Sequence, residues 1–288
     1  MGVAVQSHYF SVGGTVPWAE SGVGVVATQS LVDISYGPLG LALMKSGKSP
    51  QQAMKALTSA DPGAQSRQVA MLDVRGNVAA HTGEDCIPEA GHVVGKGFSA
   101  QANLMRSKRI WPAMARAFRN SKGPLAHRLM EVLDAAEAAG GDARGKQSAA
   151  ILVVNVKGSG RPWMDKVVDL RVEDSPEPLT ELRRLIRIQE ASVMAGAATG
   201  LLAQGKFAEA KSLLQSASRK APELDEIKFW QGVSLLNDRK VDQALPLLKK
   251  VIAVNADWGK VLKSMARTPL LTLPPRRVER VLQRARGN

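Results

Sequence analysis

The segment Asp142-Ala-Arg-Gly-Lys-Gln147-Ser148 leads directly into the apolar run Ala149-Ala-Ile-Leu-Val-Val154. A polar, flexible stretch that ends in β-branched residues predicts a loop entering a buried strand. Gly140 and Gly141, just before it, are typical of the end of a helix. Loops that a rigid strand holds in place often carry binding and catalytic groups. We therefore expect a functional site beside this loop.

The residues on either side of this loop predict a mixture of strands and helices. Valine-rich runs predict strands, and apolar residues at a spacing of 3.6 predict two helices. A Ser49 cap with Pro50 and Gln52 predicts the start of a further helix. The expected strands are residues 2–6, 22–28, 69–74, 78–81, 92–103, 149–156 and 167–172, and the expected amphipathic helices are residues 110–118 and 125–136. Several strands, two helices and then strands again indicate an α+β fold.

The composition excludes several classes of protein. A single cysteine, Cys86, rules out an internal disulfide framework and a cysteine-rich metal site. The first residues lack the basic segment and long apolar core of a secretory signal, and no apolar run has the roughly 20 residues of a membrane helix. We therefore expect a cytoplasmic protein without a membrane partner.

The chain changes character at Ser175-Pro-Glu-Pro178, beyond which the pattern is helical. Lys206-Phe-Ala-Glu-Ala210 matches Lys240-Val-Asp-Gln-Ala244, and the two segments are 34 residues apart. A period of about 34 residues is that of the tetratricopeptide repeat, a pair of helices. We expect one domain over residues 1–175 and a tetratricopeptide-like helical domain over residues 176–288, with a peptide or protein partner possible at residues 190–265.

Positive charge is concentrated in the second part. The net charge is +13, with 19 Lys and Arg against 15 Asp and Glu in residues 1–175 and 20 against 11 in residues 176–288. Five arginines crowd the final helix, namely Arg276, Arg277, Arg280, Arg284 and Arg286. They fit either an anion-binding tail or a solvated helix face, and we favour the solvated face. Because the basic residues lack interleaved aromatic side chains for stacking on bases, we do not favour a nucleic-acid partner.

Polar residues at the ends of the expected strands are the candidates for chemistry. Gln101 and Asn103 alternate along one strand, so their amides share a face and could donate to a developing oxyanion or to the backbone. A Ser/His/Asp relay lacks the Gly-x-Ser-x-Gly spacing. The spacing of His8, His81 and His92 matches no metal-ligand motif. We expect neither a metal nor another cofactor.

Many short segments of residues 2–175 occur in an order that resembles domain-of-unknown-function family 1028. These segments are residues 2–8, 16–20, 22–30, 36–38, 67–68, 80–83, 90–92, 98–103 and 142–148. The family is grouped with the N-terminal nucleophile hydrolases. The resemblance therefore implies a four-layer α/β/β/α sandwich and hydrolysis of an amide bond by an N-terminal Thr, Ser or Cys, whose own α-amine is the base. The helical region resembles an extension that some members carry.

The nucleophile itself has no counterpart in this sequence. Family members usually carry a strand that begins with Thr before the one that corresponds to residues 2–6, whereas here Met1 and Gly2 supply no nucleophilic side chain. We expect either a nucleophile strand upstream of Met1 or a sandwich that has lost this chemistry. The first alternative is a hydrolase of a small amide, and the second is a binding or assembly protein that acts through its helices.

The resemblance carries over onto nine positions. It implies catalytic roles for Gln101, Asn103, Arg144, Gln147 and Ser148, and substrate-binding roles for His8, Ser30, His81 and Thr82. Asp142 either orients Arg144 or caps the loop, and the sequence leaves both open. We also expect a homo-oligomer.

Overall fold

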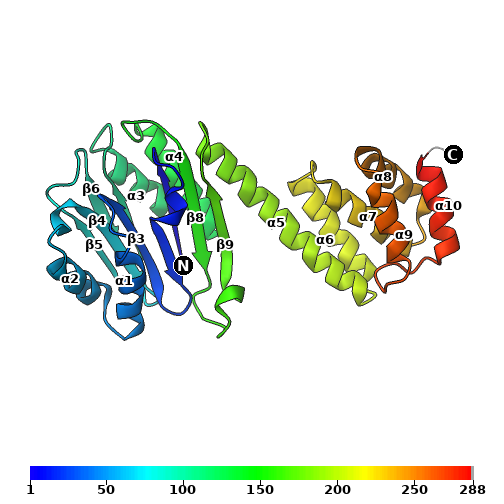
Figure 1. Cartoon of the computed structure of the whole chain (residues 1–288), viewed down its shortest axis with the longest axis horizontal. Helices are drawn as coiled ribbons and strands as arrows, with labels where there is room; N and C mark the ends of the chain where they lie inside the picture. The colour runs from blue at the N-terminus through cyan, green and yellow to red at the C-terminus, as the bar shows by residue number, and fades with distance from the viewer. Residues whose placement is uncertain (287–288) are drawn as a thin grey trace. The chain divides into compact units, whose positions relative to one another are not determined.

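The computed structural model describes residues 1–286, which divide by their contacts into two compact units. The first unit is Met1–Ile186, and the second begins at Arg187. The predicted domain boundary after residue 175 falls inside the first unit, between its last strand and the long helix that follows. The first unit is a mixture of strands and helices, and the second is helical (Figure 1).

All strand pairs in the first unit are antiparallel, and they form three sheets among the described residues. The first sheet has the order β1-β8-β9, formed by Gly2–Ser7, Ser148–Val154 and Lys166–Val172. The second has the order β2-β3-β4-β5, formed by Pro17–Glu20, Gly24–Ser30, Arg67–Asp73 and Val78–Thr82. The third pairs β6 with β7, formed by Gly91–Gly95 and Phe98–Ala102. The strand predicted after the loop at residues 142–148 is β8, and all seven of its residues are buried.

One strand prediction needs correction. Residues 92–103 do not form a single interrupted strand but the β6–β7 hairpin. Gly97 lies in the turn with a φ of +73°, a conformation that glycine adopts without steric cost. Because of this turn, β7 runs antiparallel to β6. The edge of β7 on the side away from β6 pairs with no other strand among residues 1–286.

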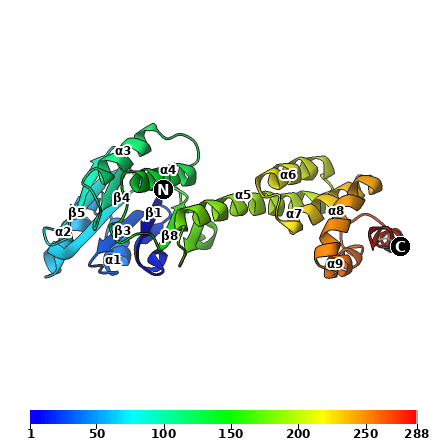
Figure 2. The same ribbon diagram turned by 90° about the horizontal axis from the view of Figure 1, so that it is seen from above.

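Helices lie on both sides of the strands in the first unit (Figure 2). Helices α1 (Tyr36–Lys45) and α2 (Pro50–Ala60) pack on the second sheet, and the predicted Ser49 capping box of α2 is present. Helices α3 (Ile110–Asn120) and α4 (Leu125–Ala138) contact each other, and α4 also packs on β1 and β8. A separate apolar cluster joins Val3 of β1 and Leu152 of β8 to Ala27 of β3. Short 3₁₀ helices occur at Val12–Gly14, Ala64–Ser66 and Pro162–Met164.

The second unit is built from paired helices around one apolar core. Helix α5 (Pro178–Ala203) starts in the first unit, and the helices that follow are α6 (Phe207–Lys220), α7 (Asp225–Asn237), α8 (Val241–Val254), α9 (Asp257–Met265) and α10 (Pro275–Arg286). Gly232 of α7 faces Leu248 of α8 so closely that a Cβ on Gly232 would lie 2.7 Å from a Leu248 methyl group. Three alanines of this unit, Ala198 of α5, Ala210 of α6 and Ala244 of α8, are fully buried. No helix in the described part of the chain is long and apolar enough to cross a membrane.

Candidate functional site

The first unit contains a cavity of about 420 Å³. It is lined by β1 on one wall, by β7 on another, and by side chains of β3, β4, α3 and α4. Strand β1 pairs only with β8, and β7 pairs only with β6, among the described residues. Both strands therefore have an unpaired edge, and residues of both line the same cavity. Its walls are mostly apolar, and its polar groups come mainly from strand ends.

The most extensive polar network beside the cavity is centred on Gln68 of β4, which is fully buried. Its Nε2 donates to the carbonyl oxygen of Ala102 at 2.9 Å and to Thr82 Oγ1 at 2.9 Å. Its Oε1 accepts from Gln29 Nε2 at 2.8 Å and from Asn103 Nδ2 at 3.1 Å. One side chain thus ties β3, β4 and β5 to the end of β7.

The backbone fixes the direction of this network. A carbonyl oxygen only accepts, so the end of the Gln68 amide that faces Ala102 must be the NH₂ group. Its oxygen then faces Asn103, whose NH₂ group must point toward Gln68. The second N–H and the carbonyl oxygen of Asn103 form no other hydrogen bond among residues 1–286, and Asn103 lines the cavity. Asn103 therefore has both a donor and an acceptor free for a ligand.

Thr82 extends the network away from the cavity. Thr82 Oγ1 accepts from Gln68 and is also hydrogen-bonded to His92 Nδ1, 2.8 Å away; Thr82 is the donor of this second bond when the imidazole carries its proton on Nε2. Nδ1 can accept only in a neutral imidazole. Burial lowers the pKa of His92, which agrees with the neutral form. Thr82 and His92 therefore support Gln68, and neither lines the cavity.

Ser30, at the end of β3, has two unusual features. Its φ of +72° lies in the left-handed region, which is costly for a residue with a Cβ. Its Oγ is buried and has no hydrogen-bond partner among the described residues. Ser30 also lines the cavity. A buried hydroxyl without a partner costs free energy unless something binds it, so Ser30 is a natural contact for a polar ligand.

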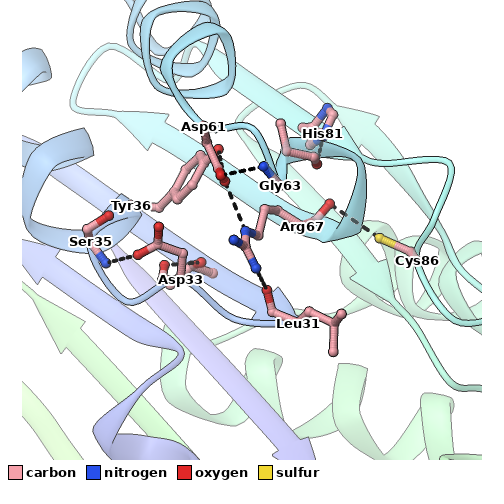
Figure 3. Close-up of polar contacts among 11 residues, drawn as sticks. Leu31, Asp33, Ser35, Tyr36, Asp61, Gly63, Arg67, His81 and Cys86 are labelled. Carbon is pink, nitrogen blue, oxygen red and sulfur yellow. Dashed lines mark hydrogen bonds and ion pairs between the residues drawn. The ribbon is translucent and has the colours of Figure 1, made fainter.

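A charged cluster holds the chain directly after Ser30 (Figure 3). Arg67, the β-sheet partner of Ser30, donates through Nη1 to the carbonyl oxygen of Leu31 and through Nε to Asp61 Oδ2 at 2.9 Å. The buried Tyr36 hydroxyl also donates to Asp61 Oδ2, at 3.1 Å, and Gly63 N–H donates to Asp61 Oδ1 at 2.7 Å. The hydrogen bond from Arg67 is the main reason why the pKa of Asp61 is lowered, while burial raises the pKa of Tyr36. This cluster keeps the turn after β3 in place.

We expect Asp61→Asn to lower the free energy of unfolding at pH 7 by about 1–2 kcal/mol, because a charged acceptor of three hydrogen bonds is lost. A carboxyl whose pKa is lowered by folding stabilises the protein above its unfolded pKa, and that contribution is lost as the pH falls through the folded pKa. The difference between wild type and variant should therefore shrink below about pH 4. Urea denaturation at pH 7 and pH 3 measures it, and an equal difference at both would contradict this role.

The loop at residues 142–148 carries a second charged cluster. The Asp142 side chain is only 4% exposed, and both its oxygens accept from the Arg144 guanidinium, at 3.0 and 2.7 Å. Asp142 Oδ1 also accepts from the Arg144 backbone N–H at 2.9 Å. Asp142 therefore does both things that the sequence left open: it orients Arg144 and it caps the loop. Arg144 Nη2 then reaches Ser7 Oγ, at the end of β1, at 3.4 Å.

This loop is joined to the strand end that carries Asn103. The N–H of Ala143 donates to the carbonyl oxygen of Leu104 at 2.9 Å, and the N–H of Arg106 donates to the carbonyl oxygen of Gly141 at 3.2 Å. Asn103 and Arg144 thus belong to two backbone segments that are hydrogen-bonded to each other, and both side chains line the cavity. Glu137 of α4 lines it too, and burial raises the pKa of its carboxyl.

The nine predicted site residues separate into two groups. Gln101, Asn103, Arg144 and Ser30 line the cavity, and Thr82 supports them through Gln68. The other four, His8, His81, Gln147 and Ser148, do not line it. His81 Nε2 is hydrogen-bonded to the carbonyl oxygen of Ala64, and Ser148 is fully buried between Val12 N–H and the Tyr9 carbonyl oxygen. Gln147 binds the exposed Asp174, and the His8 side chain is exposed.

Sequence reasoning missed the residues that organise the cavity, above all Gln68 and Gln29. Both are amides near the end of a strongly apolar strand, which is the position that drew attention to Gln101 and Asn103. An amide near the end of an apolar strand therefore indicates a candidate residue. It does not show which amides contact one another when their strands are far apart in the sequence. No group of three or more His, Cys, Asp or Glu side chains within residues 1–286 could hold a metal ion.

Comparison with known proteins gives two family matches and a similar solved structure. A family model described as "Family of unknown function (DUF1028)" matches residues 1–182. The chain belongs to this family. The tetratricopeptide repeat model matches residues 201–267. The DUF1028 protein SPO2555 from Silicibacter pomeroyi has a crystal structure that is similar to this chain, with a TM-score of 0.58 and 31% sequence identity. The similarity covers 65% of this chain and 81% of that one. No curated protein matches the chain.

Proposed function

We propose that the DUF1028 unit is an amidohydrolase domain of the N-terminal nucleophile type, which binds a small amide in the cavity between β1 and β7. In this proposal the two larger sheets are the inner layers of an α/β/β/α sandwich, and the helices are its outer layers. The observation that carries it is the free N–H and carbonyl oxygen of Asn103 in the cavity wall. A donor and an acceptor side by side match the carbonyl and N–H groups of an amide.

The nucleophile in this proposal is a Thr, Ser or Cys on an extended segment that pairs with β1. Two unpaired strand edges at one cavity support this, because each offers backbone N–H and carbonyl groups to an added strand. The N–H group at Met1 already continues the β1–β8 ladder, donating to the carbonyl oxygen of Val154 at 2.8 Å. Intact-mass measurement and terminal sequencing of the protein from its native cell test this step. A strand-forming segment with a terminal Thr, Ser or Cys is the expected result.

The cavity residues then take separate roles. The nucleophile adds to the amide carbon while its own α-amine accepts the proton, and the carbonyl oxygen gains negative charge. Asn103 donates its free N–H to that oxygen, and Gln101 is the second candidate donor. Arg144, held by Asp142, adds positive charge at the mouth. The amine leaves with the proton, and water hydrolyses the acyl intermediate.

We expect Asn103→Ala to abolish the binding of small amides while the protein stays folded. A thermal-shift screen against simple primary and secondary amides measures binding, since a ligand at 100 times its Kd stabilises the native state by about 2.7 kcal/mol. In a protein that carries the proposed nucleophile segment, loss of one oxyanion donor should lower kcat on such a substrate by about 100-fold to 1000-fold. His81→Ala is the matched control, because His81 is a polar residue of the same unit that lies outside the cavity. A shift that survives in Asn103→Ala would overturn the proposed site.

A second candidate function is protein binding by the helical unit, favoured by the tetratricopeptide match at residues 201–267. Helix pairs of this type commonly form extended binding surfaces. Two exposed valines, Val193 at 64% and Val254 at 72%, lie within the region predicted for a partner, residues 190–265. A homo-oligomer stays a prediction, which size-exclusion chromatography with light scattering would test. The cytoplasmic location also stays a prediction.

A further inference from the structure

The helical unit has a cavity of its own, of about 340 Å³. It lies where the start of α8 meets α10 and the segment before α10. Its apolar lining is Val241, Leu273 and Val281. Its remaining lining residues are four arginines, namely Arg239, Arg277, Arg280 and Arg284. An apolar floor with a rim of cations is an unusual combination, because arginine side chains repel one another when no anion lies between them.

Three of the four arginines have no acidic partner within the part of the chain that the structure describes. Arg284 Nη2 donates to Asp242 Oδ1 at 2.8 Å. Arg239, Arg277 and Arg280 form no ion pair with any carboxylate among residues 1–286, and Arg277 and Arg280 are exposed. By contrast, the neighbouring Lys240 and Lys263 are both paired with a carboxylate. The cavity therefore collects positive charge that the unit itself does not neutralise.

We propose that this cavity binds an acidic peptide segment of a partner protein, with an apolar side chain on the cavity floor and its neighbouring carboxylates on the arginines. Arginine binds carboxylates through paired, charge-assisted hydrogen bonds. At this cavity Arg284 already makes one charge-assisted hydrogen bond of this kind, from Nη2 to Asp242 Oδ1. The first backbone N–H groups of α8, a helix of 14 residues, add a partial positive charge nearby.

The lining favours a peptide over a nucleic acid. Single-stranded nucleic acids bind to basic grooves that also present aromatic side chains for stacking on bases. The cavity has no aromatic lining residue, and its apolar residues are aliphatic. This inference goes beyond the hydrolase proposal, since the cavity lies wholly within the helical unit. It deepens the second candidate function, protein binding by the helical unit, by naming an acidic peptide as the ligand.

The test is fluorescence anisotropy of the full chain with a fluorescein-labelled peptide of alternating glutamate and leucine. We expect it to bind, and the same peptide with glutamine for glutamate to bind at least about tenfold more weakly, since about 1.4 kcal/mol corresponds to tenfold. The double variant Arg277→Gln with Arg280→Gln should weaken binding of the acidic peptide by about tenfold or more. Far-ultraviolet circular dichroism should show unchanged helix content, because both side chains are exposed.

The matched control is the double variant Arg267→Gln with Arg276→Gln. It removes the same charge from exposed arginines of the same unit that do not line the cavity. It should bind the acidic peptide within about twofold of wild type. Equal weakening by both double variants would overturn the proposal, because it would indicate only non-specific attraction to a basic surface. Tighter binding of an oligothymidine, weakened by Arg277→Gln with Arg280→Gln, would overturn it in favour of nucleic acid. No binding of the acidic peptide would overturn it as well.

Discussion

Replacing Gln68 by leucine should lower the free energy of unfolding by about 2–4 kcal/mol. The substitution keeps roughly the side-chain volume but removes a donor and an acceptor at a fully buried position. The Ala102 carbonyl oxygen loses a donor at 2.9 Å, and the Gln29 and Asn103 amides both lose their acceptor. Buried polar groups left without partners cost about 1–3 kcal/mol each. Equilibrium denaturation in urea measures the loss.

The same variant should disturb the site as well as the stability. Without Gln68 Oε1, nothing among the described residues fixes which end of the Asn103 amide faces the cavity. Amide binding in the thermal-shift screen should therefore weaken in any Gln68→Leu protein that remains folded. Gln51→Leu is the matched control, because the Gln51 side chain makes a single hydrogen bond within residues 1–286, an exposed one to the carbonyl oxygen of Val78. Its effect should stay within about 0.5 kcal/mol. Similar losses in the two variants would show that the Gln68 network has no special role.

Much of the fold could be predicted from the sequence because it depends on local patterns. Valine-rich and β-branched runs marked β1 and β8, apolar spacing of 3.6 marked α3 and α4, and the Ser49 capping box marked the start of α2. The repeat of 34 residues marked the helical unit, and the tetratricopeptide match at residues 201–267 confirms it. The β6–β7 hairpin was missed because a strand interrupted by glycines and a hairpin with a glycine turn have the same local signal.

The candidate site was harder to predict because it depends on contacts between distant segments. Gln68 is hydrogen-bonded to Gln29, which is 39 positions away in the sequence, and to Asn103, which is 35 positions away. Polarity at a strand end indicated Asn103 and Ser30, and it equally indicated His81 and Ser148, which bind the protein's own backbone. All four are polar residues at the end of an expected strand, so this pattern does not distinguish the cavity residues from the structural ones. Only the three-dimensional arrangement separates a side chain that lines a cavity from one that holds a turn.

We expect Asp142→Ala to destabilise the first unit by about 2–4 kcal/mol. The carboxylate is 4% exposed and accepts from the Arg144 guanidinium, the Arg144 backbone N–H and the His8 backbone N–H. Removing one partner of a buried ion pair leaves the other charge uncompensated, at a cost of about 3–5 kcal/mol. The Arg144 side chain is 39% exposed, so water recovers part of that cost. Urea denaturation monitored by tryptophan fluorescence measures the difference.

The choice of substitution separates the two roles of Asp142. Asparagine can still accept from the Arg144 backbone N–H but carries no charge, so Asp142→Asn should keep the loop cap and lose the ion pair. We expect it to cost roughly half as much as Asp142→Ala, and to free the Arg144 guanidinium from the cavity mouth. Asp174→Ala, which removes the exposed carboxylate that Gln147 binds, is the control and should change stability by less than about 0.5 kcal/mol. If Asp142→Asn were as stable as wild type, the ion pair would not hold Arg144, and the loop that enters β8 would depend on its backbone hydrogen bonds alone.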